Sequence, residues 1–167
     1  MGLIRSREQD RTRLSEVYDR YGSDIYRYLM VLLSGRNFAE DVMQEVFLRL
    51  LGASRKNPEA VGNRLYVMQV ARNEAFRALK KSRRPAEDRF ELLDVAAPAR
   101  ISKVEKLAIQ EAVSALPEEQ REVIHLKVFM NMSFAEIADV TGVTVNTAAS
   151  RYRYAAQKLR ESLSEEE

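Results

Sequence analysis

Residues 133–159 read SFAEIADVTGVTVNTAASRYRYAAQKL, which is the pattern of two helices joined by a tight turn. Ser133, followed three residues later by Glu136, predicts a capping box at the start of the first helix. Gly142 predicts the turn, because glycine adopts the left-handed backbone at little cost. Thr144 is expected to cap a second helix that runs to about residue 163. Together these signals predict a helix-turn-helix.

The second of these helices carries charge of one sign. Between residues 144 and 160 the charged side chains are all basic: Arg151, Arg153, Lys158 and Arg160. A helix of this charge suits the phosphates of nucleic acid. An ordinary helical hairpin with a basic outer face would show the same pattern, so the charge favours DNA binding and leaves that alternative open.

Composition sets the broad class of the protein. The chain has 167 residues, enough for one domain or two small ones, and 46% of them are hydrophobic, enough to bury a core. Only 6 glycines and 4 prolines favour an all-α fold over a loop-rich β fold. The formal net charge is +2, so any affinity for nucleic acid must come from local patches. The absence of cysteine excludes disulfides, zinc–thiolate sites and thiol catalysis, and it suits a reducing cytosol.

Membrane and enzyme classes are disfavoured. The apolar run at residues 29–33 is far too short to span a bilayer, and residues 1–13 contain no apolar signal core. The single histidine, His125, has no second histidine or cysteine nearby, so a metal or general-base role is not expected. No nucleophile–base pair or phosphate loop can be assembled. We therefore expect a non-enzymatic, cytoplasmic protein with no membrane insertion, no cofactor and no metal.

The spacing of apolar residues predicts three helices in the first half, over residues 14–33, 38–51 and 65–82. Residues 1–13 are polar and predict a frayed start. Asn37 and Glu40 predict a cap for the second of these helices. Residues 52–64 contain a proline and two glycines, so they predict a loop with at most one helical turn.

One face of the helix at 38–51 is polar, and it consists of Asp41, Gln44, Glu45 and Arg49. A solvated helix surface is the usual explanation for such a face. A docking surface for a basic partner helix is the functional alternative. A carboxylate pair for acid–base catalysis is a third alternative, but it requires an apolar pocket and a perturbed pKa, which nothing in the sequence indicates.

The end of the helix at 65–82 is strongly basic. One acidic residue, Glu74, stands among six basic ones: Arg72, Arg77, Lys80, Lys81, Arg83 and Arg84. Cations also favour helix C-termini, so a solvated helix end is one explanation. The density of charge beside a loop and Tyr66 is more typical of a nucleic-acid groove.

The pattern breaks at residues 85–101, which are locally acidic, include two prolines and predict a linker. Helical spacing returns from Ile101, and Pro117 is expected in the first turn of a further helix that reaches about residue 129. With the helix-turn-helix these segments predict a small four-helix domain. The chain is therefore expected to be all-α, with two small helical domains at residues 1–84 and 102–167.

Four blocks of the sequence resemble the bacterial sigma-70 family, and specifically its short extracytoplasmic-function (ECF) group. They are DRYGSDIYRYL (19–29), AEDVMQEVFLRLL (39–51), VARNEAFRALKKSRR (70–84) and LPEEQREVIHLKVFMNMSFAEIADVTGVTVNTAASR (116–151). A helix-turn-helix alone is weak evidence, but the last three blocks together in one chain are specific. The resemblance covers nearly the whole chain, from about residue 13 to 163.

The resemblance implies a subunit that binds core RNA polymerase and directs promoter recognition, DNA melting and transcription initiation. Residues 1–84 would be sigma domain two, residues 85–101 a flexible linker and residues 102–167 sigma domain four. Domain four would also contact the polymerase flap. An anti-sigma factor, often membrane-anchored in this family, is expected as a further partner.

The resemblance also implies which residues face each partner. Those that face the coiled coil of the polymerase clamp are Asp41, Gln44, Glu45 and Arg49. Those that bind the minus-ten element as its strands separate are Asn63, Tyr66, Asn73, Arg77, Lys80 and Lys81. Those at the minus-thirty-five element are Asn146, Thr147, Ser150 and Arg151, which face bases, and Arg153 and Tyr154, which face the backbone.

The chain departs from the family pattern at four positions. Tyr66 replaces the usual tryptophan, and Arg77 replaces a common aspartate. Ala148 and Ala149 replace the usual valine and lysine of the recognition helix. Because the lysine would contact phosphate or a base, the promoter sequence cannot be inherited from better-known members.

A conventional helix-turn-helix regulator that binds an operator as a dimer is the main alternative function. In that case the first half would be a sensor or a dimerisation module. Such a regulator has no need of a polymerase-docking face, so block 39–51 favours the sigma factor. An adaptor built from helical bundles would leave both basic runs unexplained.

Overall fold

The computed structural model describes residues 2–33, 36–82 and 102–164, and every regular element in these ranges is a helix. The first half contains α1 (Gly2–Leu32), α2 (Arg36–Lys56), the short 3-10 helix η1 (Ala60–Gly62) and α3 (Arg64–Ser82). The second half contains α4 (Lys103–Ser114), α5 (Glu118–Ile124), the π-helix η2 (His125–Phe129), α6 (Phe134–Thr141) and α7 (Val145–Ser164). The expected all-α fold is confirmed. The expected linker, residues 85–101, lies outside the described residues.

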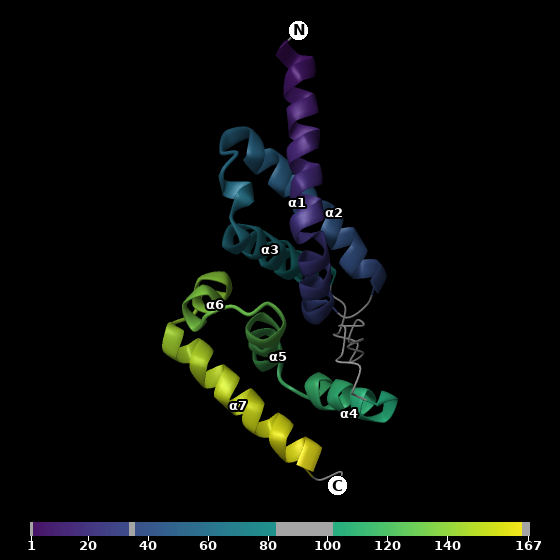
Figure 1. Ribbon diagram of the computed structural model, residues 1–167, viewed down its shortest axis with the longest axis vertical. Helices are drawn as coiled ribbons and strands as arrows, with labels where there is room; N and C mark the ends of the chain where they lie inside the picture. Colours follow the sequence, from purple (N-terminus) through teal and green to yellow (C-terminus); the bar gives the residue numbers. More distant parts are fainter. Residues whose placement is uncertain (1, 34–35, 83–101, 165–167) are drawn as a thin grey trace.

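The first half is a bundle in which α1, α2 and α3 all contact one another (Figure 1). The apolar stripes predicted from the sequence face inward, and Ile25, Leu29, Val46, Leu50 and Met68 are fully buried. Burying a side chain of this size stabilises a fold by roughly 1.5–3 kcal/mol. The polar face of α2 is thereby directed outward.

The second half is organised around α7, which contacts α4, α5 and α6. Ala148 and Ala155 of α7 are fully buried; Ala148 belongs to the same apolar cluster as Leu126 and Ile137, and Ala155 packs in a smaller cluster with Leu116 and Ile124. Ala148 is therefore a core residue. Its difference from the valine that is usual in the family changes a buried side chain and leaves the surface of α7 unchanged.

The two halves pack against each other. Helix α3 lies beside α6, and α1 contacts α5 (Figure 1). Buried residues of both halves, including Leu29 and Met68 from the first and Leu126 and Ile137 from the second, belong to one apolar cluster. The core is thus continuous across the chain.

The expected frayed start at residues 1–13 is wrong for residues 2–13, which form the first turns of α1. Asp10 is buried and accepts a hydrogen bond from Arg55 of α2, with 2.8 Å between Arg55 Nε and Asp10 Oδ2. This ion pair tethers the extension of α1 to the end of α2. Its partners are 45 positions apart, so helical spacing near the N-terminus could not reveal it.

The loop expected at residues 52–64 is shorter than predicted. Helix α2 continues to Lys56, and Asn37 lies inside its first turn instead of capping it. Residues 57–63 then include η1, which is held against α1 because the hydroxyl of Tyr21 donates to the carbonyl of Gly62 at 2.9 Å. Gly52 lies inside α2, because one glycine does not end a helix whose other face is packed.

The expected helix at 117–129 changes type part-way along. It is α-helical from Glu118 to Ile124 and then widens into η2, where the Met130 amide bonds the His125 carbonyl at 3.2 Å. Asn131 ends this segment with a positive φ of 51°. The wide turn leaves Val128 and Phe129 exposed while Leu126 stays in the core.

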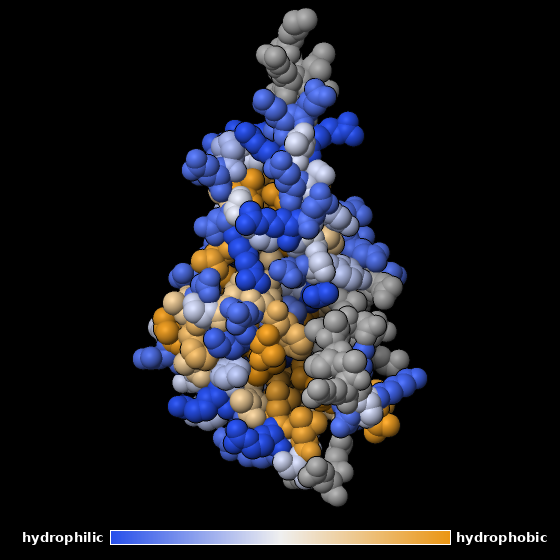
Figure 2. Space-filling model, in the orientation of Figure 1, coloured by the Kyte–Doolittle hydropathy of each residue, from blue (hydrophilic) through white to orange (hydrophobic). Residues whose placement is uncertain are grey.

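Polar side chains cover the upper part of the molecule around α1, and apolar side chains gather lower down (Figure 2). Exposed apolar residues of the second half include Val104 and Leu107 of α4, which are 77% and 56% exposed. Within the part of the chain that the structure describes, no helix combines the length and the apolar character needed to cross a bilayer.

Candidate nucleic-acid and partner interfaces

The helix-turn-helix forms as the sequence predicts. The Glu136 amide donates to Ser133 Oγ at 3.2 Å, and the Ser133 amide donates to the Glu136 carboxylate at 2.7 Å. These bonds, first to the backbone and then to the side chain of Ser133, lower the pKa of Glu136. Gly142 takes the left-handed conformation with φ 72°, and its amide bonds the Ala138 carbonyl at 2.8 Å. The angle between α6 and α7 is therefore fixed by local bonds.

Thr144 caps the start of α7 as expected, because its hydroxyl accepts a hydrogen bond from the Thr147 amide at 3.1 Å. The two threonine hydroxyls also lie 2.8 Å apart. Thr147 is half-buried in this cap, whereas the neighbouring Asn146 is exposed. Of these two residues expected to contact bases, Asn146 has the more exposed side chain.

The remaining α7 candidates divide between two sides of the helix, because Arg153 and Tyr154 lie away from the buried Ala148 and Ala155, whereas Arg151 lies three and four residues from them on the side that packs on α5. Arg153 and Tyr154 are exposed, and the Arg153 guanidinium lies over the Tyr154 ring at 5.4 Å from its centroid. Ser150 is half-buried. Arg151 is 23% exposed in its side chain and forms an ion pair with Glu119 of α5, with 3.3 Å between Arg151 Nη2 and Glu119 Oε1. This pairing was not predicted from the sequence.

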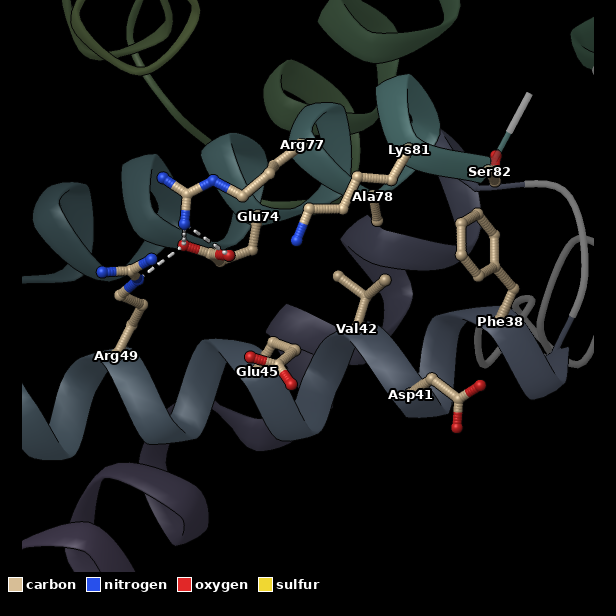
Figure 3. A pocket seen from close by; sticks show the side chains of 10 residues that line it. All are labelled: Phe38, Asp41, Val42, Glu45, Arg49, Glu74, Arg77, Ala78, Lys81 and Ser82. Carbon is tan, nitrogen blue, oxygen red and sulfur yellow. Dashed lines mark hydrogen bonds and ion pairs between the residues drawn. The ribbon is translucent and has the colours of Figure 1, made fainter. Parts of the chain in front are cut away.

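The polar face of α2 is solvent-exposed along its length. Asp41, Gln44, Glu45 and Arg49 are all exposed, while Val42 and Val46 on the opposite face are buried. The face borders a groove of about 410 Å³ between α2 and α3 (Figure 3). The groove walls combine the carboxylates of Asp41 and Glu45 with the cations Arg77 and Lys81 and the ring of Phe38. The structure thus brings part of the expected polymerase-docking set beside part of the expected minus-ten set.

Glu74 of α3 organises this groove, a role that its position among basic residues did not predict. Its carboxylate is nearly buried, and it accepts hydrogen bonds from Arg49 Nε at 3.0 Å and from Arg77 Nη1 at 3.0 and 3.2 Å (Figure 3). The spacing of three between Glu74 and Arg77 was a signal for the second bond. The first bond required knowledge of how α2 lies against α3.

The basic end of α3 has a stripe of exposed polar and basic side chains and one arginine that points inward. Asn73, Arg77, Lys80 and Lys81 are exposed on helical spacing. Arg72 is not part of this surface, because it points into the second half and bonds Glu122. Arg83 and Arg84 lie outside the described residues.

The other end of α3 holds the two remaining minus-ten candidates. Asn63 precedes the helix, and its side-chain oxygen accepts hydrogen bonds from the amides of Leu65 at 2.9 Å and Tyr66 at 3.4 Å. Asn63 is exposed, and its side-chain NH2 group is a potential donor. Tyr66 lines a shallow depression with Arg49 and Lys56. An aromatic ring and two cations in one depression, which Glu45 also lines, could receive an unstacked base and its phosphate.

Comparison with known proteins agrees with this arrangement. The family model for sigma-70 region 2 matches residues 17–85, and the model for sigma-70 region 4 matches residues 106–159. The ECF RNA polymerase sigma factor SigL of Mycobacterium tuberculosis is 29% identical over 159 residues, which span 89% of this chain and 88% of SigL. The ECF RNA polymerase sigma factor RpoE of Cereibacter sphaeroides is 27% identical over 93% of this chain and 89% of its own.

Two solved structures share the fold. CnrH in complex with the cytosolic domain of CnrY has a TM-score of 0.65 at 21% identity, over 92% of this chain and 89% of CnrH. The sigma factor RpoE in complex with the anti-sigma factor NepR from Bartonella quintana has a TM-score of 0.65 at 22% identity, over 90% of this chain and 96% of RpoE. With both family regions matched in order, this chain belongs to the sigma-70 family and is a non-enzymatic ECF sigma factor that directs RNA polymerase in promoter recognition and transcription initiation.

Proposed function

We propose that the two halves of this sigma factor divide its task. Residues 1–84 dock on core polymerase and bind the minus-ten element, and residues 102–167 bind the minus-thirty-five element. Residues 85–101 connect them. The support for this division is that the exposed acidic and basic surfaces of the first half and the basic recognition helix of the second half lie on separate helices, α2, α3 and α7.

The exposed face of α2 is the proposed docking surface for the clamp coiled coil. The single observation that carries this assignment is that Asp41, Gln44 and Glu45 are exposed on a helix whose opposite face is buried in the core. Carboxylates arranged in this way complement a basic partner helix and raise the rate of encounter. Arg49, held by Glu74, adds a fixed donor at the end of the same face.

The test is co-purification of the full chain with core RNA polymerase. We expect the wild type to bind and the triple variant Asp41→Ala, Gln44→Ala, Glu45→Ala to lose binding. The matched control is Glu16→Ala with Asp19→Ala, which removes two exposed carboxylates from α1. Equal retention of the triple variant and the control would overturn the docking assignment.

The basic stripe of α3 is the proposed minus-ten surface. Arg77, Lys80 and Lys81 supply charge for the phosphates of separated strands, and Tyr66 and Asn63 supply a ring and an amide donor at the other end of the helix. Phosphate contacts of this kind weaken steeply with salt. Replacing Lys80 and Lys81 by Gln should therefore reduce the salt dependence of binding to a minus-ten strand.

The recognition helix α7 is proposed to enter the major groove at the minus-thirty-five element. Asn146, Ser150 and Arg151 face bases near its N-terminus, and Thr147 supports the helix start at the same surface. Arg153 and Tyr154 lie about two turns beyond Asn146 and within one turn of Ser150 and Arg151, and they contact the backbone. A helix that begins with small polar side chains and continues with cations suits this division between base edges and phosphates.

We also propose two further partners, the polymerase flap and an anti-sigma factor. The exposed apolar side chains of the second half, including Val104, Leu107 and Val128, would carry the contact with the polymerase flap. An anti-sigma factor would hold the free protein in the cytoplasm. We expect the complex of the two proteins not to bind core polymerase. Alanine at Val104 and Leu107 should weaken flap binding and leave minus-ten binding intact.

A further inference from the structure

Residues 57–63, which we call the α2–α3 segment, lead into the proposed minus-ten surface. The last of them, Asn63, has an extended backbone with φ −87° and ψ 116°. Its side-chain oxygen accepts hydrogen bonds from the amides of Leu65 and Tyr66 at 2.9 and 3.4 Å. Asn63 is thereby fixed to the start of α3 on one side, and its position depends on what holds the residues before it.

The α2–α3 segment has weak structure of its own. Its regular part is the single 3-10 turn η1, in which the Gly62 amide donates to the Glu59 carbonyl and the Asn63 amide donates to the Ala60 carbonyl, each at 3.1 Å. One turn of this kind has poor hydrogen-bond geometry. Asn57, Glu59 and Gly62 are exposed. The conformation of the segment must therefore be supplied by the helices beside it.

Val61 is the first anchor of the segment, two residues before Asn63. It is 4% exposed. Together with Leu14 and Val17 of α1 and Leu50 of α2, it lines a narrow crevice that has no room for a water molecule. Movement of Val61 would open a void among apolar side chains, which is unfavourable.

Gly62 is the second anchor, directly before Asn63. Its carbonyl accepts a hydrogen bond from the Tyr21 hydroxyl at 2.9 Å. Tyr21 is 6% exposed, so its packed ring fixes the position of that hydroxyl. The partners of the two anchors lie on α1 within two turns of each other, at Leu14, Val17 and Tyr21.

The same stretch of α1 is also joined to the end of α2. Asp10 lies about one turn before Leu14 and accepts a hydrogen bond from Arg55 Nε at 2.8 Å. Asp10 is 6% exposed, and a buried carboxylate without a partner is strongly unfavourable. Arg55 stands two residues before the α2–α3 segment begins. Residues 10–21 of α1 therefore hold both ends of the segment.

We propose that residues 10–21 of α1 form a brace, which positions Asn63 for contact with the bases of the minus-ten element. Tyr21 and Asp10 are positioning residues in this brace, because both are buried and act through the α2–α3 segment. The inference rests on the proposed assignment of Asn63 to the minus-ten element. It gives the first turns of α1 a part in the choice of promoter.

The brace affects base preference more than general affinity. Hydrogen bonds to base edges are directional and weaken steeply when donor and acceptor are misaligned, so a displaced Asn63 discriminates less between bases. Lys80 and Lys81 lie at the other end of α3 and act on phosphates as point charges. Their contribution does not depend on the position of the α2–α3 segment.

The experiment compares variants of the full chain bound to core RNA polymerase. The probe is a pool of single-stranded DNA whose minus-ten segment is randomised. Enrichment of particular sequences measures base preference, and the dissociation constant for the unselected pool measures general affinity. Tyr21→Phe removes the hydroxyl and keeps the buried ring. One hydrogen bond changes an equilibrium constant roughly two- to ten-fold, so enrichment should fall by that factor while general affinity is retained.

The matched control is Tyr26→Phe, which removes a hydroxyl from a half-buried position of the same helix and should keep the wild-type enrichment. Arg55→Ala should lower enrichment in the same way as Tyr21→Phe. Arg55→Lys, which keeps a cation beside Asp10, should restore part of it. This rescue distinguishes positioning by the ion pair from a general loss of packing.

A second measurement follows the α2–α3 segment in the free protein. The chain has no cysteine, and Glu59 is exposed, so Glu59→Cys provides a single position for a spin label. The mobility of the label in electron paramagnetic resonance should rise in Tyr21→Phe and stay unchanged in Tyr26→Phe. Equal mobility in the two variants would show that the Tyr21 hydroxyl does not hold the segment, and it would overturn the brace.

Asn63→Ala separates the brace from the function on which it rests. If Asn63→Ala loses enrichment and Tyr21→Phe does not, the brace is wrong and the assignment of Asn63 stands. Equal loss of enrichment and of general affinity in Tyr21→Phe would also overturn the brace. If Asn63→Ala keeps the wild-type enrichment, the assignment of Asn63 to the minus-ten element fails, and the brace fails with it.

Discussion

Arg49 of α2 and Glu74 of α3 join two helices across the groove, with 3.0 Å between Arg49 Nε and Glu74 Oε1. Arg49 belongs to the proposed docking surface, and the other partner of Glu74, Arg77, belongs to the proposed minus-ten surface. One carboxylate thus positions a cation on each surface.

Replacing Glu74 by Ala should loosen both arginines. Their side chains are 58% and 47% exposed, so water can solvate them, and the free energy of unfolding should fall by only about 1 kcal/mol. Co-purification with core polymerase should fall more clearly, because Arg49 is no longer fixed. Urea denaturation and pull-down measure the two effects. Glu40→Ala, at an exposed position of α2, is the control, and identical behaviour of the two variants would contradict this role for Glu74.

Two glycines should respond to alanine with opposite signs. Gly142 has φ 72°, and a Cβ there meets nothing within 4 Å, so Gly142→Ala should cost about 1 kcal/mol through backbone strain alone. Gly52 lies inside α2, where a Cβ also meets nothing within 4 Å. Gly52→Ala should therefore stabilise the protein by roughly 0.5–1 kcal/mol. Thermal or urea unfolding of both variants checks the pair, and equal signs would be the contrary result.

Acid should weaken the protein through His125. Burial, with a smaller effect from the positive charge of Arg27, lowers the pKa of this histidine from 6.5 to about 4. Between these pH values the unfolded chain binds a proton at His125 and the folded protein does not. The stability contributed by neutral His125 is therefore complete above pH 6.5 and is lost as the pH falls toward 4, by up to about 3 kcal/mol.

The measurement is the pH dependence of urea unfolding in the wild type and in His125→Phe, which keeps a ring against Tyr28 and Phe129. The difference between the two proteins isolates the histidine from carboxylates that titrate nearby in pH. Parallel profiles between pH 4 and 6.5 would show that His125 does not titrate in this way.

Arg151 should affect promoter choice more than general affinity. It lies near the start of α7 and is oriented by Glu119, so Arg151→Ala should reduce binding to a specific minus-thirty-five duplex by about ten-fold or more. Binding to random duplex should change less. Glu119→Ala leaves the arginine charge in place but unfixed and should give a smaller loss of specificity. Equal losses on both duplexes would assign Arg151 to phosphate contact.

The local signals of the sequence predicted the helix-turn-helix closely. Ser133, Glu136, Gly142 and Thr144 act on neighbours within a few residues, so their roles follow from spacing alone. The apolar stripes of the long helices were equally clear. The family assignment also decides against a dimeric operator-binding regulator, because region 2 matches the first half.

Roles that depend on how helices meet could not be predicted in this way. Arg72 was grouped with a basic run but turns toward Glu122, which is 50 positions away. Glu74 appeared as an isolated acid, although it receives Arg49 from a different helix. The ion pair between Asp10 and Arg55 likewise needed the packing of α1 on α2. Periodicity identifies the buried face of a helix, but it does not identify the helix that covers that face.

The cross-half bonding of Glu122 bears on how sigma factors exchange parts. A chimera that joins residues 1–84 to the second half of a relative would keep Tyr28 and Arg72 while changing the group that they face. Such a hybrid would pair its halves less tightly even if each half folded normally, because Tyr28 and Arg72 would lose the carboxylate that accepts their hydrogen bonds. Exposed side chains near the start of α7 such as Asn146 are remote from Glu122 in sequence and can be transplanted singly, whereas Arg151 is paired with Glu119 of the same helix as Glu122. Evolution of promoter preference is therefore expected to proceed by grafting these side chains, and whole-domain shuffling is expected to require compensating changes in the opposite half.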